Sequence, residues 1–75
     1  MDKNYIIFII GYDWYKELEK LELACDEAYE LAEEIAYRYK DFCLRNEWDE
    51  CYETLYTYCD EVISFWAVWD DVKRK

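Results

Sequence analysis

A stripe of apolar positions runs without a slip along residues 13–45. Its members follow one another at alternating spacings of four and three residues: Trp14, Leu18, Leu21, Cys25, Ala28, Ala32, Ile35, Tyr39 and Phe42. This spacing places every member on one side of an α-helix. Basic residues near the end of the segment suit the negative end of a helix dipole. We therefore predict one long helix over residues 13–45.

A second stripe follows over residues 47–74. Its members are also spaced by four and three: Trp48, Tyr52, Leu55, Cys59, Val62, Trp66 and Trp69. Continuing the phase of the first stripe would place Asn46, Asp49 and Glu53 in the apolar seam, so the phase breaks there. Asn46 is a favourable residue to cap a new helix. We predict a tight turn at residues 45–47 between two long helices, with the lone serine, Ser64, inside the second.

Pairing the two stripes predicts an all-α fold, an antiparallel helical hairpin. Small residues of the first helix then face aromatic residues of the second, with Ala28 opposite Phe65 and Trp66. Alternation of large and small side chains lets a core interdigitate. The stripes are wider than a two-helix seam can cover, so dimerisation into a four-helix bundle stays open.

The N-terminal apolar segment, residues 1–12, allows two interpretations. Residues 5–10 read YIIFII and precede Gly11, which is typical of a strand that pairs with another chain. The alternative is a short helix or arm folded over the open end of the hairpin. With either, the 75 residues form one domain.

The net charge of the chain limits the classes of molecule that it could bind. Nineteen acidic residues against nine basic ones give a net charge of −10, which repels nucleic acid and anionic membranes. We therefore expect a basic protein as the partner, with no direct nucleic-acid or membrane binding. The run at residues 5–10 is too short to span a bilayer. The sequence shows no signal-peptide pattern, so we predict a cytoplasmic location. We accordingly predict that the four cysteines are reduced and buried.

Catalysis, metal binding and cofactors are not predicted. The chain has no histidine, the usual general base and commonest metal ligand. Its four cysteines form no C-x-x-C pair: Cys25, Cys43, Cys51 and Cys59. Cys43 and Cys51 flank the expected turn, so a disulfide between them is geometrically conceivable. A phosphate-binding glycine loop is also missing from a chain with one glycine.

Acidic residues gather in the first predicted helix. Eight acids and one lysine between them fall within the eighteen residues from Glu17 to Glu34. Over about 27 Å of helix this is one net negative charge per about 4 Å, close to the density along one DNA strand. We predict that seven of these acids bind a partner in place of phosphates: Glu19, Glu22, Asp26, Glu27, Glu30, Glu33 and Glu34.

In size, charge and aromatic content, the chain resembles small acidic phage-encoded inhibitors, including anti-CRISPR proteins and DNA mimics. The resemblance covers the whole chain, but it is one of composition, and no family motif matches. It implies a non-enzymatic inhibitor that occupies the nucleic-acid-binding site of another protein. A structural or regulatory homodimer and an acidic antitoxin-like partner of a basic toxin are the alternatives.

Overall fold

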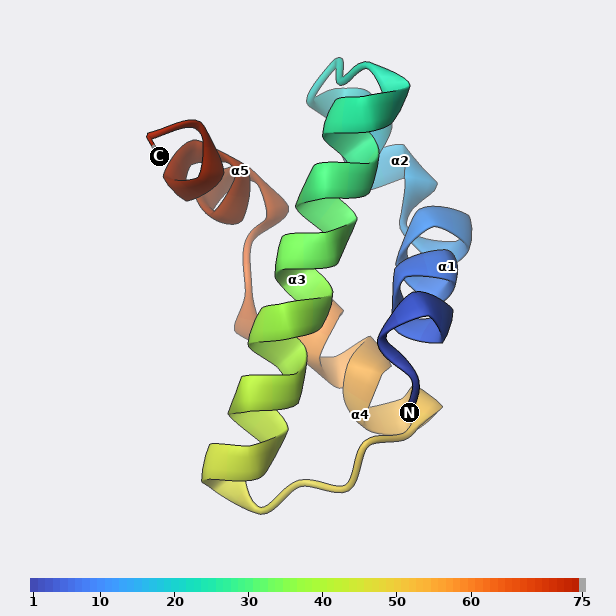
Figure 1. Ribbon diagram of the computed structural model, residues 1–75, viewed down its shortest axis with the longest axis vertical. Helices are drawn as coiled ribbons and strands as arrows, with labels where there is room; N and C mark the ends of the chain where they lie inside the picture. Colours follow the sequence, from blue (N-terminus) through green and yellow to red (C-terminus); the bar gives the residue numbers. More distant parts are fainter. Residues whose placement is uncertain (75) are drawn as a thin grey trace.

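One central helix organises the molecule. The computed structural model describes residues 1–74, and these contain helices and no strand. The central helix, α3 (Cys25–Asn46), lies between α1 (Lys3–Asp13) and α5 (Phe65–Lys73) (Figure 1). Three short elements complete the fold: α2 (Tyr15–Lys20), α4 (Tyr52–Thr57) and the π-helix η1 (Tyr58–Val62). The all-α prediction is confirmed for the described residues.

The long helix predicted over residues 13–45 is divided. Such a helix would be about 50 Å long, whereas the longest extent of the fold is 33 Å. The chain turns between α2 and α3, where Glu22 takes a left-handed conformation with φ of 55°. Glu27 then accepts a hydrogen bond of 2.9 Å from the Ala24 amide and caps the new helix. The turn returns α1 and α2 to the side of α3, and it avoids the like-charge i, i+4 pair of Glu22 and Asp26 that a straight helix would contain.

The second predicted helix, residues 47–74, is also divided. The chain leaves α3 through Glu47, at a φ of 56°, and α4 begins after residue 51. At the end of η1 the amide of Ile63 donates to the carbonyl of Tyr58 over 3.1 Å, a π-type bond. Ser64 accepts from the Ala67 amide and caps α5, so it lies outside the helix in which we expected it. Breaks at both places let α5 pack on α3.

Residues 3–13 form a helix, so the strand interpretation of the N-terminal segment is wrong. The Asp2 carboxylate caps α1 by accepting a hydrogen bond of 3.4 Å from the backbone N–H of Asn4. A helix satisfies its own backbone groups, whereas a lone strand would leave them unpaired. The apolar sequence then places Ile6 and Ile10, both with no exposed surface, against α3.

Two anchors join the elements. The fully buried Tyr39 of α3 shares a 2.7 Å hydrogen bond with Thr54 of α4, and its hydroxyl donates to the Cys51 carbonyl over 3.1 Å. Trp14, at the α1–α2 junction, donates from its indole nitrogen to Asp60 of η1 over 2.9 Å. The Trp14 ring also packs at 5.5 Å from the ring of Tyr56. The Trp14 contacts connect parts of the chain that the hairpin prediction kept apart, whereas Tyr39 and Thr54 would also lie close together in that hairpin.

Buried ionisable groups should make the fold sensitive to alkali. Burial raises the pKa values of Tyr39, Tyr58 and Cys59 to about 12. In an unfolded chain tyrosine titrates near about 10 and cysteine near about 8.5. Since the folded values are the higher ones, the stability that the neutral forms provide is complete below the unfolded values. It is lost as the pH rises toward 12. We expect the free energy of unfolding, measured with urea and a thiol reductant, to decrease from about pH 9 upward.

The control for this titration is Tyr39→Phe, which removes one of the buried ionisable groups. Its free energy of unfolding should decrease less steeply with pH than that of the parent chain. A parent stability that stays constant through this range would contradict the expectation.

Candidate functional site

The structure distributes the seven predicted partner-binding acids over two helices and the turn between them. Glu19 lies on α2, Glu22 lies in the turn, and the other five lie on α3: Asp26, Glu27, Glu30, Glu33 and Glu34. The prediction that they share one continuous helix face is therefore wrong. The nucleic-acid-like charge density that we derived for a straight helix does not apply to the folded chain.

Three of these acids have structural roles. Glu27 caps α3, as described above. Glu33 pairs with Lys3 of α1 at 3.4 Å. Glu34 accepts from Arg38 at 2.8 Å, and this hydrogen bond is the main cause of a raised pKa for the Arg38 guanidinium. The Lys3–Glu33 pair connects α1 with α3, and Arg38, which also contacts Asp71 at 3.2 Å, connects α3 with α5.

Glu30 belongs with Glu33 and Glu34. All three line a hollow of about 420 Å³ that Lys3 and Tyr37 also line. A lysine and an arginine accompany these carboxylates, so their charge is partly compensated within the protein. We therefore regard this hollow as the lesser part of the acidic surface.

The remaining three acids gather at the α2–α3 turn and are called here the acidic turn: Glu19, Glu22 and Asp26. All three are exposed, and none forms an ion pair with another residue of the described chain. Their neighbours in sequence, Leu23 and Cys25, point toward an adjoining groove that both line. Uncompensated carboxylates beside an apolar surface suit a partner with mixed basic and apolar side chains.

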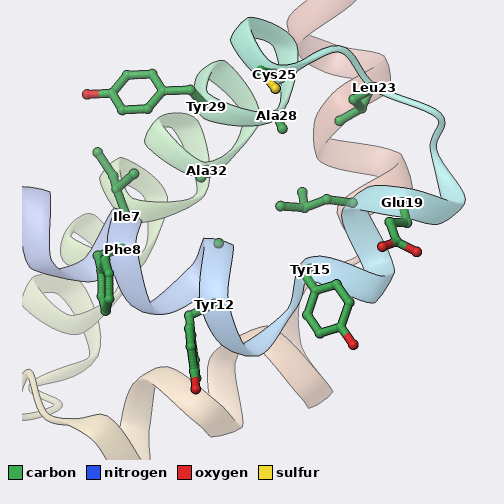
Figure 2. A pocket seen from close by; sticks show the side chains of 12 residues that line it. Ile7, Phe8, Tyr12, Tyr15, Glu19, Leu23, Cys25, Ala28, Tyr29 and Ala32 are labelled. Atoms are coloured by element: carbon green, nitrogen blue, oxygen red, sulfur yellow. The ribbon is translucent and has the colours of Figure 1, made fainter.

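This apolar groove, of about 550 Å³, lies between α1, α2 and α3. Figure 2 shows Phe8 and Tyr12 of α1 on one side, Tyr29 of α3 on the other, and Glu19 of the acidic turn at one end. The size falls within the range of about 300–1,000 Å³ typical of ligand sites. The sequence stripes did not predict this groove, because they assigned α2 and α3 to one helix.

Small residues line the groove. Gly11 comes from α1, and Ala28 and Ala32 lie one turn apart on α3. The prediction that Ala28 faces Phe65 and Trp66 is wrong, since Trp66 is 67% exposed and Ala28 opens into the groove. Glycine and alanine leave room for another backbone to come close.

Aromatic side chains continue outward from the groove along α1. Tyr5, Phe8 and Tyr12 are 55%, 64% and 72% exposed, at spacings that share one helix face. The rings of Phe8 and Tyr12 stack with centroids 6.1 Å apart. Because contiguous exposed aromatics often mark protein interfaces, this face extends the candidate site.

The thiols of the described residues form neither a disulfide nor part of a cluster that could hold a metal ion. All four cysteines are free, and no group of three or more cysteine or carboxylate side chains in residues 1–74 is placed to hold a metal ion. Cys43 and Cys59 are buried, but Cys25 and Cys51 are exposed, so the prediction of four buried thiols is wrong for two. None of the helices in residues 1–74 is long and apolar enough to cross a membrane.

No protein-family model, curated protein or solved structure matches this chain.

Proposed function

We propose that this chain is a non-enzymatic inhibitor that binds a basic, nucleic-acid-binding surface of another protein. The observation that supports this most is the acidic turn, three exposed carboxylates that form no ion pair within residues 1–74, next to an apolar groove. The overall charge of −10 also supports the proposal, because such a charge speeds encounter with a positive surface and disfavours acidic partners.

The proposed inhibition follows from competition for the same cations. Lysine and arginine side chains that bind phosphates can bind carboxylates with similar geometry. A target whose basic residues pair with Glu19, Glu22 and Asp26 has those residues occupied and cannot use them for DNA or RNA. Glu30, Glu33 and Glu34 would extend the contact along α3. A CRISPR effector or another nuclease is the proposed kind of target, in the cytoplasm, where thiols stay reduced.

The experiment that tests this function is capture with competition. The chain is immobilised and exposed to the heparin-retained fraction of a bacterial lysate, which is enriched in basic nucleic-acid-binding proteins. We expect retained proteins to be released by excess duplex DNA. They should also be released when the salt rises from about 0.1 M to about 1 M, which shortens the Debye length from about 10 Å to about 3 Å. Retention that DNA does not displace would contradict the proposal.

Two alternatives keep specific support. The exposed aromatic face of α1 favours a helical homodimer, although two copies of charge −10 repel each other. The acidic turn would equally suit an antitoxin that neutralises a basic toxin. A mass measurement in solution distinguishes the homodimer from the inhibitor. A stable dimer that persists after charge reversal at the acidic turn would support the homodimer.

A further inference from the structure

Resting on the proposed function, we infer that the groove between α1, α2 and α3 receives the apolar face of a basic amphipathic helix of the partner. The acidic turn then pairs with lysine or arginine residues that flank that face. This mode, a helix laid into an apolar groove, is a recurrent form of peptide recognition. It names the shape of the partner, which the proposed function leaves open.

Gly11 indicates that something approaches the groove closely. A Cβ at this position would meet nothing within 4 Å, so no neighbouring side chain requires a glycine. Its φ is not positive either, so the backbone does not require one. Glycine inside a helix is less favourable than alanine. An approaching backbone is a physical reason for a glycine at a position where the fold itself would be better with alanine.

The aromatic side chains around the groove supply the binding surface. Phe8, Tyr12 and Tyr29 are each more than half exposed and stand on both sides of the groove (Figure 2). Aromatic residues bury large areas at a small cost in side-chain entropy, which makes them common anchors of interfaces. An apolar helix face placed between them would remove these rings from water.

Charge selects the occupant. A second copy of this chain would bring another −10 charge and its own acidic turn to the same place. A basic segment instead meets Glu19, which lines the groove at one end (Figure 2), and the exposed Glu22 and Asp26 are next in sequence to the lining residues Leu23 and Cys25. Charge complementarity therefore favours a basic partner helix over self-association.

The test uses two synthetic peptides of leucine and lysine, each about four helical turns long. In one the leucines fall on a single helix face, and in the other the same residues are scrambled around the helix. We expect the amphipathic peptide to bind at least about tenfold more tightly, a difference of about 1.4 kcal/mol. Equal binding of the two peptides would overturn the inference, because charge alone would then explain the association.

Substitutions in the groove separate it from the rest of the surface. Ala28→Trp fills the groove and should weaken binding of the amphipathic peptide at least about tenfold. Its matched control is Ala67→Trp, at an exposed alanine of α5 that does not line the groove.

Gly11→Ala should raise the urea midpoint of unfolding and at the same time weaken binding of the amphipathic peptide. If Gly11 served only the fold, its replacement would not raise stability while weakening peptide binding.

The native thiols provide a readout that needs no substitution. Cys25 lines the groove and Cys51 lies in a different hollow beside Trp48, and both are exposed. Bound amphipathic peptide should slow alkylation of Cys25 and leave that of Cys51 unchanged. Equal alkylation of Cys25 with and without saturating peptide would place the peptide elsewhere and overturn the inference.

The two proposals fail in different ways. If reversal of the acidic turn abolishes capture of nucleic-acid-binding proteins while Ala28→Trp leaves peptide binding intact, the inference is overturned and the proposed function stands. If the groove binds the peptide as expected but no captured protein is displaced by DNA, the proposed function fails and the groove remains a site for basic helices.

Discussion

Reversing the acidic turn with Glu19→Lys, Glu22→Lys and Asp26→Lys is expected to abolish binding to the basic target. Each change replaces an attraction by a repulsion of similar size, and a single exposed pair contributes up to about 1 kcal/mol. Three reversals should therefore weaken binding by about 100-fold or more, which corresponds to about 2.8 kcal/mol. The measurement is the dissociation constant for a captured target, or for the leucine–lysine peptide, at low salt.

The chain offers a close control for this variant. Glu47→Lys, Asp49→Lys and Glu53→Lys make the same change in net charge at the other end of α3. Glu47 shares the left-handed backbone of Glu22, with φ values of 56° and 55°, and Glu53 is an exposed helical position like Glu19. We expect the control to lose only the modest effect of overall charge. Equal losses in the two variants would show that the acidic turn is not a site.

Trp14→Ala is expected to have the largest effect on stability. Trp14 is 6% exposed, packs on Tyr56 and donates a 2.9 Å hydrogen bond to Asp60. Truncation of a buried tryptophan leaves a cavity and typically costs about 3–5 kcal/mol. A small domain has about 5–15 kcal/mol of stability in total, so much of the fold's margin would be lost. Urea unfolding followed by circular dichroism measures the change.

Trp66→Ala is the matched control, because it removes the same side chain from a position that is 67% exposed. Substitutions at the surface usually change stability by less than about 0.5 kcal/mol. The hairpin prediction placed both tryptophans in one core, where the two losses would be similar. A loss for Trp66→Ala as large as that for Trp14→Ala would favour that hairpin over the fold described here.

The helical content and the break after α3 could be predicted from the sequence, but the breaks after α2 and after η1 could not. The apolar stripe gives the right period and places the end of α3 within one residue, since residue 45 was expected and the helix ends at Asn46. Helices commonly end at a glycine, which takes the left-handed conformation without strain. Here glutamates take that role at both ends of α3, Glu22 before it and Glu47 after it. At residues 45–47 the break in the apolar phase still revealed the turn, whereas at Glu22 the stripe continues and no glycine marks the end of α2.

The candidate site could be predicted only in part for the same reason. Acidity at residues 17–34 was visible, and so was the i, i+4 spacing of Glu34 and Arg38 within one helix. The partner of Glu33, Lys3, lies across the α2–α3 turn that the stripe hides, and the cap from Glu27 exists only because α3 begins at that turn. The groove exists because α1 and α2 fold back on α3. Its signals in the sequence were Gly11 inside an apolar helix and alanines at i, i+4. Both features also fit an ordinary buried seam.

The opposing local preferences at the turn between α2 and α3 make it the expected hinge for an exchange of N-terminal arms. Its left-handed glutamate costs roughly 1–2 kcal/mol, while the cap from Glu27 returns about 0.5–2 kcal/mol. Avoiding the Glu22–Asp26 repulsion adds about 0.2–0.5 kcal/mol. Local preferences thus nearly cancel, and the packing of α1 and α2 on α3 decides for the bent form. A neighbouring molecule offers an identical α3, so straightening this hinge at high concentration would exchange N-terminal arms between copies. The Glu-to-Lys variant keeps like charges at the hinge, and it therefore tests recognition without favouring arm exchange.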